Sequence, residues 1–398
     1  MDNTNEKMTA KQWMALIGMT FSVFVFNTSE FMPIGLLTDI GTDLHVSLDT
    51  AGMLISVYAW FVALLSLPLM LLVCKMEYRK LLLCVLALFV VSHVASSFAS
   101  NYAMLMASRI GVACAHSVFW SIASPMAVRV VPRRYKSLAL SMIIAGTSVA
   151  MIVGLPLGRV IGLLIGWRMT FLNIAIAAFA TMIYLSVVFP KVSNRDTFNL
   201  NKLPHMLRSH ALIGIYIITI IISTSYYIGY SYIEPFLAQV GGLSETMVTI
   251  ALTAFGIAGM LGGVIFSRYY EAYRRLFVIA TVVGMSLCML LLRPAALTIE
   301  TVMLLIVLWG ISATAFNVAM QAEIIKITPA SSTAVAMSIF SGIFNFGIGG
   351  GTLIGGIVCT RASISYIGYV GGALAAIGVV FTVWKLVGVL SRTKPVQL

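Results

Sequence analysis

Two charged side chains lie deep inside long apolar stretches, where an ionised group needs a partner, water or a functional role. Glu30 stands in the first stretch, about 26 Å along a helix from Trp13, and Arg109 stands roughly 10 Å into the fourth. Because the two depths agree, we expect an ion pair or a shared water network. Burial favours a neutral carboxylic acid whereas a neighbouring guanidinium favours the carboxylate, so a change of surroundings could bind or release a proton. A static pair that fixes helix packing is the alternative.

The fourth apolar stretch carries three polar or aromatic side chains at helical spacing. His116 lies seven residues after Arg109 and four before Trp120, which places all three on one helix face. We predict that this face borders a cavity, where His116 binds a substrate or relays protons and Trp120 stacks on a flat ligand. A hydrogen-bonded packing histidine is the alternative.

Further polar and aromatic residues at membrane depth are predicted to bind substrate. Amide side chains both donate and accept hydrogen bonds, which suits hydroxyl groups, and tyrosine rings stack on the rings of a ligand. Interhelical hydrogen bonding would explain the amides as well, and a position at the membrane interface would explain the tyrosines and Glu234. The predicted binding residues besides His116 and Trp120 are Asn27, Tyr230, Glu234, Asn317, Gln321 and Asn345.

Two other ionisable residues are expected at the membrane surface. Arg159 lies about 33 Å into the fifth stretch, so its long side chain is predicted to extend to the outer surface. His93 lies near the outer end of the third stretch and is expected at the interface.

The elements that carry these residues follow from the composition. The chain has 398 residues, of which 60% are hydrophobic and 10% are charged, whereas a soluble domain carries roughly 25% charged residues. Such a chain requires lipid as its main solvent, and about 20 apolar residues span the bilayer core. We therefore predict an all-α membrane protein with twelve transmembrane helices, at residues 12–38, 50–73, 81–99, 102–128, 137–165, 169–189, 211–238, 246–267, 276–292, 301–325, 333–359 and 365–390.

The longest polar gap divides these twelve helices into two sets of six. We predict an N-terminal six-helix bundle over residues 1–190, a cytoplasmic linker over 191–210 and a C-terminal six-helix bundle over 211–398. Because six is an even number, both bundles would have the same orientation. Parallel repeats of this kind place the substrate path at their interface, near the bilayer midplane.

A repeated pattern of small residues links the fifth and eleventh helices. An offset of 197 residues aligns Gly154 with Gly351 and Gly158 with Gly355, which predicts that the two bundles are pseudo-symmetric. Small residues one turn apart allow close helix approach, and a proline bends a helix by removing a backbone bond. The residues predicted to form this packing motif in the fifth helix are Gly146, Gly154, Pro156 and Gly158.

The basic residues predict the orientation. Twenty of the twenty-five Lys and Arg residues fall at the termini and in the loops of one side, and three fall in loops of the other. Basic loops stay in the cytoplasm, so we expect cytoplasmic N and C termini. The net charge of +12 then faces anionic lipid, which argues against a nucleic-acid partner.

Several segments resemble the major facilitator superfamily, in particular its drug/proton antiporter branch. ASRIGVACAHS resembles the family's span-four arginine motif, with Arg109 as the arginine, and the G-x7-G-L-P-L-G pattern from Gly146 to Gly158 resembles the antiporter motif. The segments FNTSEFMPIGLL, YSYIEPF and FSGIFNFGIGGG are similar to bacterial sugar-efflux transporters of the arabinose/IPTG type. The loop LLVCKMEYRK departs from the usual G-x-L-A-D-R-x-G-R-R, since Lys75 replaces the aspartate of its charge latch.

This resemblance implies a proton-coupled secondary transporter that exports small sugars or sugar-like compounds by alternating access, as a monomer in the bacterial inner membrane. A multidrug/proton antiporter is the alternative, followed by a sugar/proton symporter. A membrane enzyme is disfavoured because no nucleophile–base pair stands out, and neither a Walker A sequence nor a metal motif indicates a cofactor. The expected partners are a small-molecule substrate, protons and the lipid bilayer.

Overall fold

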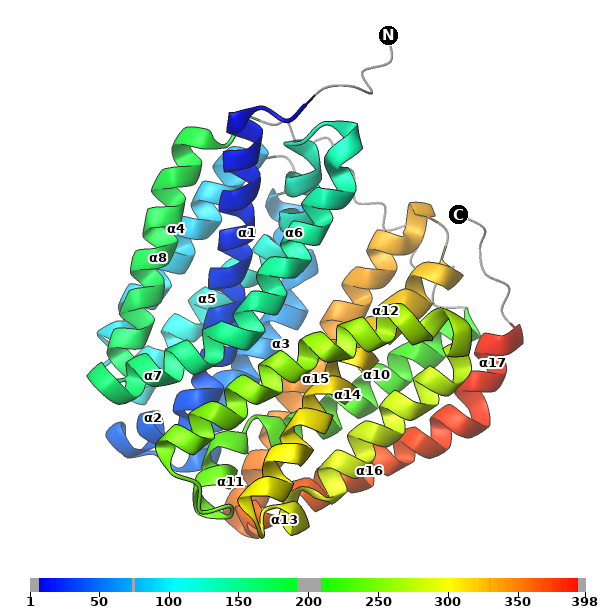
Figure 1. Cartoon of the computed structure of the whole chain (residues 1–398). Coiled ribbons are helices and arrows are strands. Elements are labelled where there is room, and N and C mark those ends of the chain that lie inside the picture. Colours follow the sequence, from blue (N-terminus) through cyan, green and yellow to red (C-terminus); the bar gives the residue numbers. More distant parts are fainter. Residues whose placement is uncertain (1–6, 74–75, 192–208, 329, 393–398) are drawn as a thin grey trace. The chain divides into compact units, whose positions relative to one another are not determined.

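The computed structural model describes residues 7–73, 76–191, 209–328 and 330–392 (Figure 1). Within these ranges every regular element is a helix, which confirms the predicted all-α class. Two sequence expectations lie largely or wholly outside the described residues, namely the central linker and the role of Lys75 in the loop after the second span.

Eleven of the described helical stretches are long and apolar enough to cross a membrane. One of them, α12 (Glu245–Leu290), has 46 residues and is roughly 69 Å long, about twice the thickness of the hydrocarbon core. Its backbone leaves the helical region at Tyr273, with φ −126° and ψ 35°, where two helices meet at a kink. Counted as two spans, α12 brings the total to the twelve that the sequence predicts.

Contacts group the chain into two compact units. Unit 1 comprises Met1–Ile40 and Leu64–Phe198, and unit 2 comprises Gly41–Ala63 and Asn199–Leu398. Helix α3 (Leu48–Val73) therefore divides between them, although a boundary at 191–210 would leave all of it in the first bundle.

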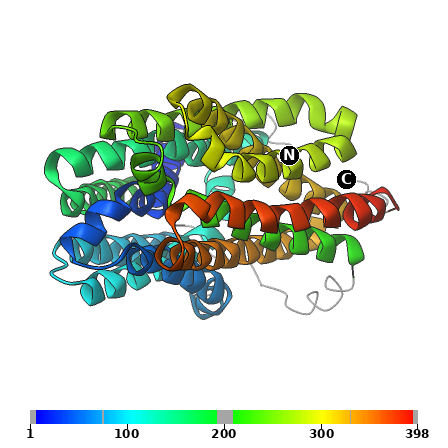
Figure 2. The same cartoon turned by 90° about the horizontal axis from the view of Figure 1, so that it is seen from below.

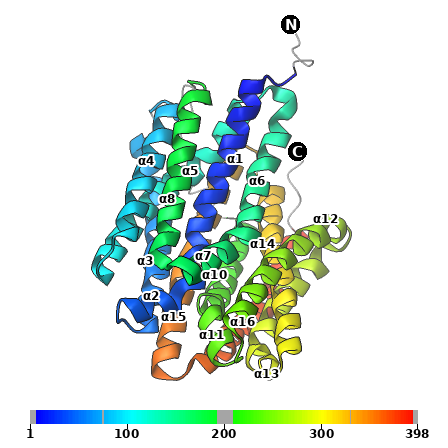
Figure 3. The same cartoon turned by 60° about the vertical axis from the view of Figure 1, so that its left-hand side comes forward.

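In unit 1, α4 packs against α5 and α8, while α1 packs against α6 and α8 (Figure 3). The described helices of this unit are α1 (Ala10–Phe31), η1 (Met32–Leu36), α4 (Tyr78–Ser97), α5 (Tyr102–Arg129), η2 (Arg133–Tyr135), α6 (Lys136–Val149), η3 (Ala150–Gly154), α7 (Leu155–Ile165) and α8 (Trp167–Val188), with α2 (Leu37–Asp43) spanning the division between the units.

Helix α1 has a defined beginning and a defined change of geometry. At its start the Thr9 hydroxyl accepts from the Gln12 amide while the Gln12 side chain accepts from the Thr9 amide, a capping box that satisfies two helix-terminal donors. At its end the tighter 3₁₀ helix η1 begins, with Pro33 in its first turn. Proline has no amide hydrogen to donate. The change of geometry therefore begins two residues after Glu30, which lies in the last turn of α1.

Three glycines allow the fifth span to approach α1 closely. A Cβ added at Gly146 would lie 2.7 Å from Thr20 O, and one at Gly158 would lie 2.8 Å from Met32 Cγ. A Cβ at Gly154 would collide with the Thr28 side chain. Between these glycines the π-helical segment η3 joins α6 to α7, and Pro156 occupies the first turn of α7. A π segment is a recognised cause of a helix kink.

In unit 2, α10 packs against α15 and α16, and α12 packs against α14. Figure 2 shows the red α16 and the orange α15 running alongside the green α10. The described helices of this unit are α10 (His210–Tyr230), α11 (Ile233–Gln239), α12, α13 (Leu292–Ala295), α14 (Ile299–Ile327), α15 (Ala330–Arg361), η5 (Ile364–Tyr366), α16 (Ile367–Phe381), η6 (Thr382–Leu386) and α17 (Val387–Arg392).

The glycine pattern of unit 1 recurs inside unit 2. A Cβ added at Gly355 of α15 would lie 2.6 Å from Ile228 O of α10, and one at Gly351 would collide with the Thr224 carbonyl. Helix α15 therefore approaches α10 as α6 and α7 approach α1, which is the internal repeat expressed in packing.

A buried carboxylate joins the kinked α12 to α14. The Glu323 side chain is fully buried and forms an ion pair with the Arg274 guanidinium. Tyr270 donates its hydroxyl to Glu323 Oε1 at 2.7 Å, and Arg274 Nε donates to the same oxygen at 2.7 Å. Position 274 falls between the expected spans at 246–267 and 276–292, so Arg274 counted among the basic loop residues and this pair was not expected.

Candidate functional site

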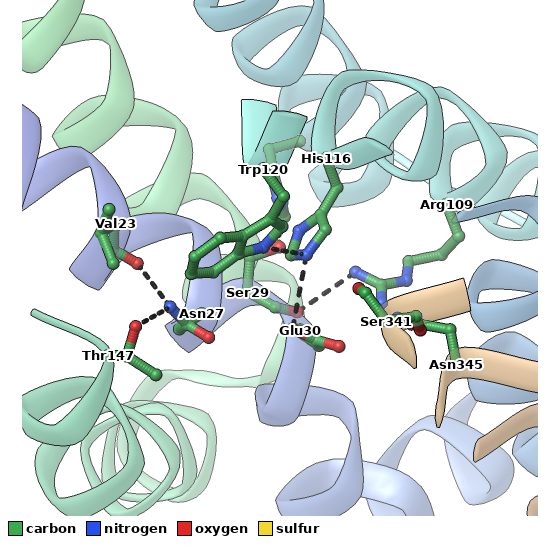
Figure 4. A network of polar contacts seen from close by, with 11 residues as sticks. Val23, Asn27, Ser29, Glu30, Arg109, His116, Trp120, Thr147, Ser341 and Asn345 are labelled. Carbon is green, nitrogen blue, oxygen red and sulfur yellow. Dashed lines mark hydrogen bonds and ion pairs between the residues drawn. The ribbon is translucent and has the colours of Figure 1, made fainter. Parts of the chain in front are cut away.

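Five of the predicted site residues lie together in unit 1 (Figure 4). Helix α1 contributes Asn27 and Glu30 from its last turns, and α5 contributes Arg109, His116 and Trp120 from one face. The side chains of His116 and Glu30 are 2% and 13% exposed, and Arg109 is 1% exposed. Ionisable groups are therefore gathered where water is largely excluded.

One imidazole nitrogen of His116 lies close to two neighbours. Trp120 Nε1 donates to His116 Nε2 at 2.6 Å, and Glu30 Oε2 lies 3.4 Å from the same Nε2. An indole nitrogen can only donate, so Nε2 must accept, and a neutral imidazole then carries its proton on Nδ1. In this arrangement Nε2 has no proton to give to Glu30. A protonated Glu30 carboxyl could donate to it instead, so the contact with Glu30 depends on where the acid's proton is.

Arg109 contacts α1 beside the acid. Its Nη1 donates to the Ser29 carbonyl at 3.3 Å, and its positive charge also acts on the Glu30 carboxyl. Figure 4 shows the guanidinium directed toward this end of α1. The acid is thus flanked by a histidine that accepts a hydrogen bond and by an arginine held through the backbone.

Asn27 lies one turn before this group and links two helices. Its Nδ2 donates to Val23 O at 3.0 Å and to Thr147 Oγ1 of α6 at 3.3 Å. The residue is 3% exposed. Both amide hydrogens are used inside unit 1, so this geometry matches the interhelical role that the sequence left open.

His93 is one of two residues whose position differs from the expectation drawn from the sequence. We expected it at the interface, but it is completely buried, and its Nε2 lies 2.7 Å from Ser29 Oγ. The rings of Phe89 and Phe171 pack against its imidazole. The depth of a residue along one helix does not reveal a polar partner on another, and Ser29 gives no signal of its own in the sequence.

Arg159 is the second residue whose position differs from the expectation drawn from the sequence. We expected its side chain at the outer surface, but it is 1% exposed, and its Nη1 donates to Gly35 O at 2.6 Å. The partner is a backbone carbonyl of the 3₁₀ helix η1, which a pattern of side chains cannot indicate.

In unit 2, the predicted residue Tyr230 belongs to a buried aromatic cluster. Its ring centroid lies 4.8 Å from that of Tyr226, 4.9 Å from Phe255 and 6.0 Å from Trp309. The cluster joins α10, α12 and α14 from within this unit. Its rings are packed against each other, as in a hydrophobic core.

The other predicted residues of unit 2 lie on three helices. Gln321 Nε2 donates to Asn317 Oδ1 one turn away on α14, so these two are brought together. Glu234 is 3% exposed in the first turn of α11. On α15, Asn345 Nδ2 donates to Ser341 O at 3.0 Å, while its buried Oδ1 has no hydrogen-bond partner among the described residues.

Comparison with solved structures supports the same fold. Two crystal structures of a bacterial homolog to the human lysosomal transporter Spinster are similar to this chain. The inward-facing, unoccupied form has a TM-score of 0.70 at 14% identity, over 97% of this chain and 95% of that chain. The inward-facing, occupied form has a TM-score of 0.71 at 16% identity, over 97% and 98%. At this identity the likeness establishes the fold alone.

The sequence profile of the Major Facilitator Superfamily matches residues 19–241 and again residues 215–397. The two matches together cover nearly the whole chain, including both the cluster around Glu30 and the helices of unit 2. With its membrane-spanning helices, repeated packing and these matches, the chain belongs to the Major Facilitator Superfamily.

Proposed function

We propose that this protein is a proton-coupled secondary transporter that exports small sugars or sugar-like compounds by alternating access. The observation that carries the proposal is the placement of Glu30, a nearly buried acid 3.4 Å from His116 Nε2 and under the influence of the Arg109 charge. Intramembrane ionisable groups of this kind are functional by default. Superfamily membership supports transport, and the acid supplies a means of coupling it to protons.

The coupling follows from competition for His116 Nε2. A protonated Glu30 can donate to this nitrogen and share it with Trp120, whereas an ionised Glu30 cannot. The ionised acid instead attracts Arg109 more strongly. Proton binding therefore changes the hydrogen bonds between α1 and α5. A proton taken up from outside would favour one arrangement, and its release into the cytoplasm would favour the other.

The sugar specificity rests on the hydroxyl-binding character of the polar residues and on the sequence resemblance to sugar-efflux transporters. A sugar hydroxyl both donates and accepts hydrogen bonds, as His116 and the amides require. The second candidate is a multidrug/proton antiporter, which the antiporter-like pattern between Gly146 and Gly158 supports equally. Symport is less favoured because of the antiporter-like pattern between Gly146 and Gly158.

The cellular setting belongs to the same proposal. The bias of Lys and Arg toward one set of loops supports cytoplasmic N and C termini. We propose that the protein works in the bacterial inner membrane as a monomer, with small molecules, protons and lipid as its partners.

Transport in proteoliposomes tests the proposal. Purified protein would be reconstituted with radiolabelled arabinose or a thiogalactoside inside the vesicles. A pH gradient with the acidic side outside would then be imposed. We expect the gradient to accelerate sugar exit, and Glu30→Gln to reduce this acceleration at least tenfold. The exposed Glu300→Gln is the matched control, since it removes an acid at a helix end.

Three results would contradict parts of the proposal. Unchanged gradient-driven transport by Glu30→Gln would remove the coupling role of this acid. Transport of hydrophobic cations without transport of any sugar would establish the drug antiporter instead. Chemical conversion of the substrate would place the protein among membrane enzymes.

A further inference from the structure

A buried histidine lies beside the residues around Glu30, and the proposed function assigns it no role. His93 on α4 is completely buried, and its Nε2 lies 2.7 Å from the Ser29 hydroxyl on α1. Its other ring nitrogen, Nδ1, is buried and has no hydrogen-bond partner among the described residues. A buried polar atom without a partner is uncommon in folded proteins and calls for an explanation.

The surroundings of His93 separate its two nitrogens. Phe171 of α8 stacks on the imidazole, and Phe89, on α4 like His93 itself, packs edge-on. From α1 the neighbouring polar group is the Ser29 hydroxyl, and from α5 the charged group that acts on the imidazole is Arg109. Nε2 therefore connects to α1, whereas Nδ1 is the position left open to a proton.

Ser29 links His93 to the residues around Glu30. Its hydroxyl contacts His93, its carbonyl accepts from Arg109, and the next residue along the chain is Glu30 itself. A hydroxyl can accept a hydrogen bond from one neighbour while donating its own hydrogen to another. Ser29 thus has the chemistry to pass a proton from an imidazole toward an acid.

Polar side chains continue from His93 toward the turn between α4 and α5. Ser96, three residues on, is completely buried and its Oγ lies 2.7 Å from Ser108 Oγ of α5. Helix α4 ends at Ser97, roughly 6 Å along the axis from His93, and Phe98 at its end is 70% exposed. His93 therefore contacts the residue before Glu30 and lies about one turn from an exposed helix end of unit 1.

We propose that His93 is a second proton-binding group of this transporter, taking protons from the α4–α5 end of unit 1 and passing them through Ser29 toward Glu30. This inference rests on the proposed function, in which Glu30 carries the coupled proton. Because Arg109 repels a second positive charge, the imidazolium would be short-lived and would release its proton while Glu30 is ionised.

The transfer balances without any other reactant. His93 Nδ1 gains a proton from the α4–α5 end, and Nε2 gives its proton to Ser29 Oγ. The hydroxyl releases its own proton toward the Glu30 carboxylate, directly or through one water molecule. One proton enters and one reaches Glu30, and the imidazole is left neutral with its remaining proton on Nδ1.

The test compares two kinds of transport by His93→Gln. A glutamine amide can keep a hydrogen bond to Ser29 but cannot take up a proton. We expect gradient-driven sugar exit to fall at least tenfold, and sugar counterflow without a pH gradient to fall less than twofold. Ser29→Ala should show the same split, because it removes the hydroxyl and little volume. The exposed His210→Gln is the matched control.

Each outcome decides between the two roles of His93. Unchanged gradient-driven exit in both variants, or an equal fall in exit and counterflow, would overturn the inference and leave a packing role. If Glu30→Gln abolishes coupling while His93→Gln does not, the inference fails and the proposed function stands. If the wild-type protein does not respond to a pH gradient at all, the proposed function fails and the inference fails with it.

Discussion

The indole N–H of Trp120 and the carboxyl of Glu30 meet at one atom, His116 Nε2, at 2.6 and 3.4 Å. These two residues come from different helices, α5 and α1, so the bonding of a single nitrogen depends on both. The protonation of the acid and the position of α1 relative to α5 within unit 1 are thereby connected.

Trp120→Phe should shift the pH dependence of transport to higher pH. The substitution keeps an aromatic ring and removes the N–H that competes with a protonated Glu30 for His116 Nε2. A neutral hydrogen bond contributes about 1 kcal/mol, so strengthening the bond from protonated Glu30 should move the profile by roughly half to one pH unit. The measurement is the sugar exit rate against pH in proteoliposomes. Trp384→Phe, at an 84% exposed tryptophan, is the control, and a profile equal to wild type would show that no competition exists.

Gly154→Ala should destabilise the protein because the new methyl group would meet the Thr28 side chain. Overpacking of this kind costs about 1–3 kcal/mol, which thermal unfolding in detergent would detect. Gly263→Ala is the matched control, since nothing lies within 4 Å of a Cβ added there.

The same contact can be tested by rescue. Thr28 Oγ1 is the nearest atom to the added methyl group and has no hydrogen-bond partner among the described residues. Thr28→Ala should therefore restore much of the lost stability in the Gly154→Ala background. Strictly additive losses would show that the two residues do not oppose each other.

Glu323→Ala and Lys326→Ala should differ sharply in stability although both remove one member of an ion pair from α14. Glu323 is fully buried against Arg274, so its removal leaves a poorly solvated charge and should cost about 3–5 kcal/mol. Lys326 pairs at 2.7 Å with Glu271, which is 75% exposed, so its removal should cost less than about 1 kcal/mol.

Thermal unfolding of the two variants side by side provides the measurement. Removing Arg274 together with Glu323 should recover part of the loss, because no unpaired charge remains. Equal effects of Glu323→Ala and Lys326→Ala would mean that burial does not govern these pairs.

The sequence alone located the membrane-spanning helices well. The expected span at 102–128 is α5 (Tyr102–Arg129), and the expected pair at 246–267 and 276–292 forms the two halves of α12. Lipid explains this success, since every span must be apolar over a fixed length and turns must be polar. Matching depths along two helices were the basis for expecting Glu30 near Arg109, and helical spacing placed His116 on the same face as Arg109.

The partners of buried groups could not be inferred in the same way. His93 and Arg159 were expected near a surface because depth was the only coordinate available. Their partners are a serine hydroxyl and a main-chain carbonyl on other segments. The pairing of Arg274 with Glu323 was missed for a related reason, since it depends on how a kinked helix returns alongside α14.

The two buried arginines of unit 1 are both held by main-chain carbonyls at the end of α1. Arg109 binds Ser29 O and Arg159 binds Gly35 O, on either side of the start of η1. A carbonyl belongs to every amino acid, so replacing residue 29 or 35 does not delete either acceptor. The Glu30 carboxyl, in contrast, belongs to a side chain and is lost when that residue is replaced. Mutation can therefore remove the acid in a single step while the cationic framework persists. If Glu30 carries the coupled proton, as we propose, this is a short evolutionary route from a coupled pump to a passive facilitator.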